Sequence, residues 1–242
     1  MTQETNPQLA KIRALLAKAE DPAASREEAE AYFAKAAELM AKYGIEQAML
    51  ADANPGTDRP ADRVIHVEGN YVVDRINLLH SILRPLNLQG IRLRGPNGRL
   101  AAEVHVFGYE ADIQRAEMLF TSLLLQAFNG MRHGRPMWGE SVTAYRKTWL
   151  MGFSEAVENR LEAAEARARG EATDGARGRS AELVLADRAS VVLASYRKAY
   201  PKAQKRTRSL AGSGFGAGER AGNAADLGGT RVGSGGRRRL TS

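Results

Sequence analysis

The chain has 242 residues, 43% of them hydrophobic, so it is long enough to bury a core, and it contains no cysteine. The missing cysteines exclude disulfides, cysteine nucleophiles and thiolate metal sites. The chain has 35 basic residues (Lys or Arg) and 28 acidic residues (Asp or Glu). Nine of the basic and two of the acidic residues follow Tyr200, so 26 basic and 26 acidic residues remain before it. The whole net charge of +7 therefore lies in the C-terminal segment, where an electrostatic partner is expected to bind.

The N-terminal residues argue against a secreted or membrane protein. Charged residues, including Glu4, Lys11 and Lys18, interrupt the first twenty positions, so no signal-peptide core is expected. The most apolar later segments, 119–128 and 183–193, are shorter than the roughly 20 residues that a membrane span needs. We expect a soluble, cytoplasmic protein with no membrane partner.

Two helices are predicted at the N-terminus. Apolar residues at helical spacing indicate a helix over residues 8–19, which cannot continue through Pro22. Ser25 and Glu28 form a capping-box pattern that begins a second helix, and Gly44 is expected to end it. The two helices would form a hairpin.

Strand signals follow the hairpin. Residues 64–67 read as a short strand, and residues 76–86 as a helix with one apolar face. Apolar and polar residues then alternate on both sides of a turn at Gly95–Gly98, which predicts a β-hairpin. This alternation is the clearest strand signal in the chain.

Three further helices are predicted. Residues 113–127 and 142–161 are amphipathic. The second helix could reach about 40 Å, so its end at residues 163–170 is expected to project into solvent. Residues 181–200 are apolar on more than one face and predict a buried helix that ends at Pro201.

These elements predict an α+β fold. It consists of an N-terminal helical hairpin, a small antiparallel sheet packed by long helices, and a disordered basic C-terminal tail. The tail has ten glycines and a single aromatic residue, too little apolar surface to offset the entropy of ordering. The expected divisions are a helical hairpin at 1–52, a linker at 53–62, an α+β domain at 63–200 and the tail at 201–242.

No motif for catalysis, metal or cofactor binding is found. The four histidines occur singly, so no metal site is predicted. Ser154 lacks the glycines of a nucleophile elbow, and the tail glycines at 212–218 lack the strand, lysine and helix of a phosphate loop. We expect no catalytic residue and no cofactor.

The basic tail is the strongest functional feature. Dense cations on a flexible chain can neutralise phosphates, which favours binding of DNA or RNA without sequence readout. The helix at 8–19 offers a second cationic surface. The residues expected to contact nucleic acid are Lys202, Lys205, Arg206, Arg208, Arg237, Arg238, Arg239, Lys11, Arg13 and Lys18.

We therefore predict a non-enzymatic accessory protein that binds nucleic acid through its tail. One alternative is a protein-interaction or assembly module, in which the hairpin or the helix at 142–168 binds another protein or a second copy. A third is an uncharacterised enzyme that uses His66, His105 and nearby carboxylates.

Three N-terminal stretches also resemble a known family. They are Lys11-Ile-Arg-Ala-Leu-Leu-Ala-Lys-Ala-Glu, Glu28-Ala-Glu-Ala and Ala37-Glu-Leu-Met-Ala-Lys-Tyr-Gly-Ile, and they are similar to the domain-of-unknown-function family two-seven-eight-six. The segments beginning at Val106, Tyr145 and Leu185 resemble the companion domain often attached to it. The resemblance implies an origin in actinobacteria or phages, and it brings no activity or catalytic residue.

Overall fold

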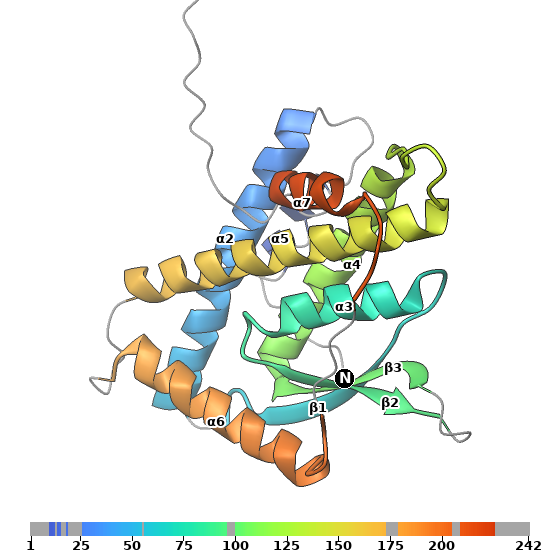
Figure 1. Ribbon diagram of the computed structural model, residues 1–242. Helices are drawn as coiled ribbons and strands as arrows, with labels where there is room; N and C mark the ends of the chain where they lie inside the picture. Colours follow the sequence, from blue (N-terminus) through green and yellow to red (C-terminus); the bar gives the residue numbers. More distant parts are fainter. Residues whose placement is uncertain are drawn as a thin grey trace, which may run out of the picture.

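The computed structural model describes residues 10–12, 14–15, 18, 26–54, 56–95, 100–172, 179–204 and 209–225. The elements in chain order are α2 (Arg26–Ala53), β1 (Pro60–His66), α3 (Val72–Leu83), β2 (Gln89–Arg94), β3 (Leu100–Tyr109), α4 (Glu110–Arg132), α5 (Val142–Glu171), α6 (Ala181–Ala199) and α7 (Phe215–Ala224). Residues 10–12, 14–15 and 18 are also helical. Figure 1 shows a small sheet that lies between α3 and α6, which confirms the predicted α+β class.

The sheet has three antiparallel strands in the order β1-β3-β2. Alternation along β3 buries Val104 and Val106 against α3 and α4. It directs His105 and Phe107 to the other face, where their rings contact Tyr196 and Tyr200, from α6 and the residue after it. The predicted hairpin is confirmed as β2 and β3, although residues 96–99 of its turn lie outside the described residues.

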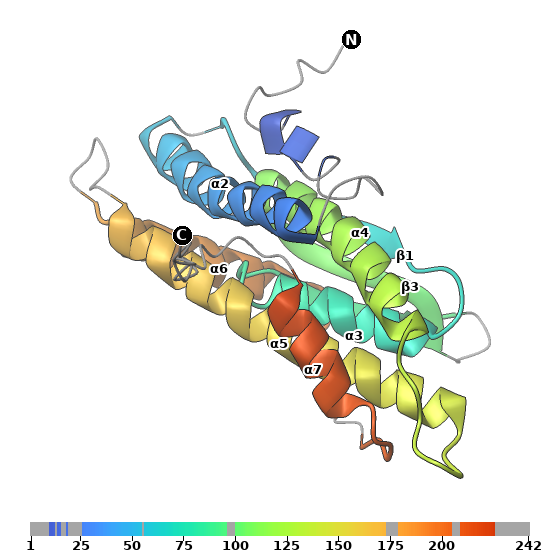
Figure 2. The same cartoon turned by 90° about the horizontal axis from the view of Figure 1, so that it is seen from above.

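One hydrophobic core joins the N-terminal helices to the rest of the protein. Ile12 and Met40 are buried in the same cluster as Leu79, Leu123 and Phe153, from α3, α4 and α5. In the view of Figure 2, α2 and α4 lie side by side. The N-terminal residues therefore complete the core that the sheet and the long helices begin.

Gly44 does not end the second helix, contrary to the prediction. Helix α2 runs through it to Ala53, because the cost of glycine in a helix, about 1 kcal/mol, is small against tertiary packing. A Cβ atom at this position would lie 1.8 Å from Nη1 of Arg115. Glycine is needed here so that an arginine can approach the helix.

The predicted disorder of segment 201–242 is wrong for residues 215–224, which form α7. Helix α7 lies against α5 (Figure 2), and Gly214, Gly218 and Gly222, which recur every fourth residue, contact it. A Cβ on Gly218 would lie 1.8 Å from the carbonyl oxygen of Trp149, and one on Gly214 would lie 2.2 Å from that of Tyr145. The glycines thus allow backbone contact between the two helices. Residues 205–208 and 226–242 of the tail lie outside the described residues.

Two other expectations about helices are corrected. The end of α5 does not project into solvent, since Glu165 and Ala168 are buried beside α2 and α6. Helix α6 is buried on one face only, and Leu183 and Val191 are exposed. Among the described helices, none is both long and apolar enough to span a membrane.

Candidate functional site

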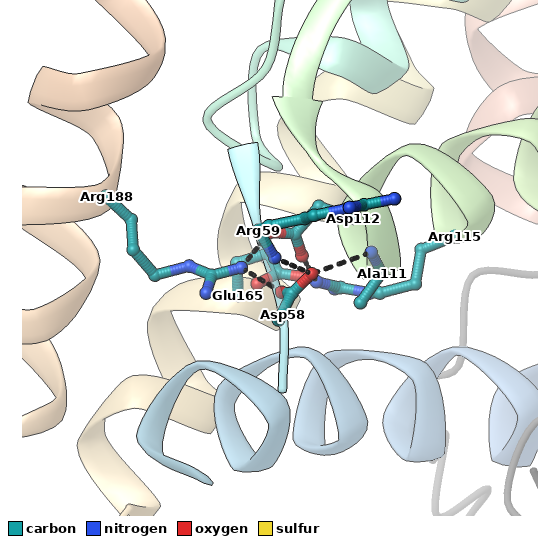
Figure 3. Close-up of polar contacts among 7 residues, drawn as sticks. All are labelled: Asp58, Arg59, Ala111, Asp112, Arg115, Glu165 and Arg188. Carbon is teal, nitrogen blue, oxygen red and sulfur yellow. Dashed lines mark hydrogen bonds and ion pairs between the residues drawn. The ribbon is translucent and has the colours of Figure 1, made fainter. Parts of the chain in front are cut away.

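A cluster of five charged side chains connects four parts of the fold; we call it the charge cluster. Figure 3 shows Arg188 from α6 on one side and Arg115 from α4 on the other, with acidic side chains between them. The acids are Asp58 before β1, Asp112 in the first turn of α4 and Glu165 near the end of α5. All five side chains are largely buried.

Every acid in the charge cluster accepts from an arginine. Arg188 Nη2 lies 2.7 Å from Asp58 Oδ2 and 3.0 Å from Asp112 Oδ2. Arg115 donates to Asp112 at 2.9 Å and to Glu165. The Arg188 guanidinium also lies over the ring of Tyr109, 3.5 Å from its centroid, a cation–π contact. These contacts connect α4, α5, α6 and the segment before β1.

Burial acts differently on the two partners of the Arg115–Glu165 pair. It raises the pKa of Glu165, and the positive charge of Arg115 opposes that rise. Burial also disfavours the charged Arg115, but Glu165 and Asp112 outweigh this cost and raise its pKa. Arg115 is therefore charged at neutral pH and holds the acids in place.

The charge cluster leaves no room for a substrate. The cavity beside it has a volume of about 20 Å³, lined by residues that include Gly44, Arg115 and Glu165. That space fits one water molecule. We assign the charge cluster a structural role, in which Gly44 of α2 packs directly on Arg115.

The histidines of the enzyme hypothesis, His66 and His105, lie on the same face of the sheet but have different partners. His105 Nε2 is 2.8 Å from Asp62 Oδ2, and its Nδ1 is 2.7 Å from the hydroxyl of Tyr200. His66 Nδ1 lies 3.1 Å from Glu103 Oε1. Among the described residues, no group of three or more His, Asp or Glu side chains is placed to hold a metal ion. The His105 contacts attach the end of α6 to the sheet.

Only three of the predicted nucleic-acid contacts are described. Lys11, Lys18 and Lys202 are exposed, and Lys18 lies over the ring of Tyr32, 5.3 Å from its centroid. Arg13, Lys205, Arg206, Arg208, Arg237, Arg238 and Arg239 lie outside the described residues. Lys202 follows α6, whereas Lys11 and Lys18 belong to the N-terminal helical residues.

A second group of cations surrounds the loop between α4 and α5. Arg132 ends α4, Arg135 lies in the loop, and Arg146 and Lys147 lie in the first two turns of α5. Among the described residues, none of these four side chains has an ion-pair partner. We call these cations, together with Met137 and Trp138, the α4–α5 surface.

The loop holds Trp138 at the tip of a closed turn. Glu140 N–H donates to the carbonyl of Met137 at 3.0 Å, and Gly139 at the third position has φ +77°, as a type II turn requires. Trp138 occupies the second position and is 105% exposed, while Met137 is 70% exposed. The largest aromatic side chain in this region therefore stands entirely in solvent.

Helix α7 and the segment before it complete this loop. The Glu140 carboxylate accepts from the backbone and hydroxyl of Ser213 and from the backbone N–H of Met137. The hydrogen bonds from Ser213 lower the pKa of Glu140, which keeps it ionised. Gly214 N–H also donates to the hydroxyl of Thr148 on α5. The one acid between residues 132 and 147 is thus engaged by hydrogen bonds.

Sequence reasoning missed both the α4–α5 surface and the charge cluster. A signal for the surface is present: Arg132, Arg135 and Trp138 fall within seven residues beside Pro136 and Gly139. The charge cluster gives no comparable signal, because Asp58 and Arg188 are 130 residues apart. Only tertiary structure brings them together.

The comparisons with known proteins concern the N-terminal segment. No curated protein and no solved structure matches the chain. Residues 9–47 match the model of a family described as Protein of unknown function (DUF2786), the family that the N-terminal motifs resemble. The matched segment includes Tyr43, Gly44 and Ile45, and Gly44 packs against Arg115 of the charge cluster. What the match shows is a resemblance to this domain of unknown function over residues 9–47.

Proposed function

We propose that this protein is a non-enzymatic accessory protein that binds nucleic acid through cations, without sequence readout. The observation that supports it most is the contrast between paired charges in the body and surplus cations in segment 201–242. Arg63, Arg84 and Arg179 each contact a carboxylate, as do both arginines of the charge cluster. The body therefore neutralises much of its own charge, and an anionic polymer would be attracted chiefly by the surplus.

The surplus begins directly after α6, between two parts of the chain that contact the rest of the fold. Residues 201–208 contain four cations and no acid. Before them, Arg188 and Tyr200 attach α6 to the rest of the fold; after them, Ser213 and Gly214 are attached to Glu140 and Thr148. Lys11, Arg13 and Lys18 would add contacts from the N-terminal helix.

The test is the salt dependence of binding to labelled duplex DNA and single-stranded RNA. For a duplex, log K should fall linearly with log salt, by about 0.9 for each phosphate contacted. Changing Lys202, Lys205, Arg206 and Arg208 together to Gln should reduce this slope by about one unit for each lost contact. Lys35→Gln is the control, because Lys35 is exposed and already paired with Glu38.

A truncation after Ala225 tests the remaining tail cations, Arg231, Arg237, Arg238 and Arg239. This end point retains α7, whereas a cut after Tyr200 would uncover the α5 backbone on which the glycines pack. An unchanged affinity and slope in both the substituted and the truncated chain would contradict the proposal.

A protein partner is the second candidate function, and the exposed apolar side chains of α6 favour it. Leu183 is 50% and Val191 40% exposed. This candidate would be favoured if the protein binds no nucleic acid at low salt and its apparent molar mass in solution increases with protein concentration. Leu183→Ser should then reduce the association.

A further inference from the structure

The two tryptophans of the chain occupy opposite environments. Trp149 is 2% exposed and stacks on Phe153 at an interplanar angle of 13°. Trp138 is 105% exposed, although burying an indole is among the largest apolar gains available to a side chain. An exposed aromatic side chain at this position contributes nothing to the core. It is available to a ligand.

The backbone around Trp138 is fixed in place. The Met137–Glu140 turn is closed by a backbone hydrogen bond, and the Glu140 carboxylate accepts from both Met137 and Ser213. Gly139 supplies the positive φ that the turn needs. A ligand that stacks on the indole would therefore meet a backbone that needs little reorganisation.

Cations lie on both sides of the indole in the chain. Arg132 and Arg135 precede Trp138 in the sequence. Arg146 and Lys147 follow it in the first two turns of α5, within about 8 Å of the start of the helix along its axis. Residues 132–147 thus carry four cations and one acid, Glu140, whose carboxylate already accepts three hydrogen bonds. The charge of this surface suits a polyanion.

A hollow beside the α5 cations offers further contact. It has a volume of about 460 Å³ and is lined by Asn70, Tyr71, Val72, Val73, Asp74, Thr143, Arg146 and Lys147. Tyr71 contributes a second aromatic ring, half-buried and 6.4 Å from the ring of Phe128. The hollow therefore brings one aromatic ring and two cations, Arg146 and Lys147, together with one acid, Asp74.

We propose that the α4–α5 surface binds single-stranded nucleic acid, with a base stacked on Trp138 and phosphates on Arg132, Arg135, Arg146 and Lys147. Bases in a duplex are stacked on one another, so an indole reaches a base face only in a single strand. This inference rests on the proposed function and deepens it, since it names the strand type and the surface that recognises it.

The experiment uses the full chain and an oligo(dT) single strand, with a duplex of equal length for comparison. Stacking should quench the fluorescence of Trp138, while buried Trp149 supplies a constant background. Trp138→Ala should weaken binding of the single strand about tenfold and leave duplex binding within about twofold. Trp138→Phe should retain most of the affinity, because phenylalanine can still stack.

Controls separate this inference from the proposed function. Leu125→Ala removes another exposed apolar side chain, on α4, and should change neither binding nor quenching. Salt-dependent binding with no quenching and full affinity in Trp138→Ala would overturn the stacking site and leave the proposed function standing. No binding of either nucleic acid at low salt would overturn both. A response of Trp138 to vesicles with anionic headgroups, with none to oligo(dT), would assign the surface to a membrane and overturn the inference.

Discussion

Arginine performs opposite tasks in the charge cluster and on the α4–α5 surface. In the charge cluster, Arg115 and Arg188 are buried, and each contacts two carboxylates. On the α4–α5 surface, Arg132 and Arg135 are exposed and, among the described residues, have no ion-pair partner. The two groups share a residue type and differ in burial and in ion pairing.

Solvation is the physical reason for the difference. A buried guanidinium loses its hydration and must recover that free energy from its partners, so its charge is committed to the fold. An exposed guanidinium keeps its hydration, and its charge can attract a phosphate. Variants that remove one partner should therefore unfold the first region and weaken binding by the second.

The largest expected effect comes from Arg115→Ala. It leaves Glu165 buried without its partner and Asp112 with Arg188 alone, so we expect the free energy of unfolding to fall by about 3–5 kcal/mol. Arg135→Ala should change it by less than about 0.5 kcal/mol, since Arg135 is exposed. Urea denaturation of both variants measures the contrast.

A double variant identifies the cause of the Arg115 effect. Arg115→Met combined with Glu165→Met removes the guanidinium and its carboxylate partner but keeps long apolar side chains at both positions, and should be more stable than Arg115→Met alone. Equal stability of the double and the single methionine variants would mean that an unpaired carboxylate does not cause the destabilisation.

The next effect concerns α7, which begins two residues after Ser213, the partner of Glu140 in the loop between α4 and α5. Gly218→Ala places a Cβ where the Trp149 carbonyl lies, and should cost about 3 kcal/mol or detach α7. In Gly216→Ala the nearest atom is Nη1 of Arg220 at 3.5 Å, so the better helix propensity of alanine should stabilise by about 0.5–1 kcal/mol. Thermal unfolding and Trp149 fluorescence report the outcome. Equal effects of both substitutions would refute the glycine contact.

The smallest effect is a pH dependence from His80 of α3. Burial, assisted by the nearby charge of Arg84, lowers its pKa from the ordinary 6.5 to about 4. At pH values between these two pKa values, His80 binds a proton in the unfolded chain but not in the folded protein. The free energy of unfolding therefore falls as the pH is lowered. We expect His80 to lower the free energy of unfolding by about 2 kcal/mol between pH 7 and pH 5.

The control for this pH dependence is His80→Gln. Glutamine does not titrate, so the variant should lose less stability than the parent over the same pH range. Denaturation midpoints at several pH values measure the difference. Parallel pH profiles of parent and variant would assign the acid sensitivity to other groups.

Much of the secondary structure was predictable because it depends on local periodicity. Alternation around residues 95–98 identified β2 and β3, and the 3.6-residue period identified α4 and α5. Gly44 was misread because glycine often ends a helix, whereas here it admits Arg115 from α4. For residues 215–224 the prediction of disorder is wrong because it rests on glycine content alone, although the four-residue spacing of Gly214, Gly218 and Gly222 is a usable signal for a helix contact.

The sequence by itself determined which segments form helices and strands and where the net charge lies, because both follow from neighbouring residues. Tertiary structure alone decided which charges are paired and which are exposed. Asp58 meets Arg188 across 130 residues, and the burial of Arg115 depends on helices from three parts of the chain. Pairing and burial are properties of distant segments in contact, so a local pattern cannot report them.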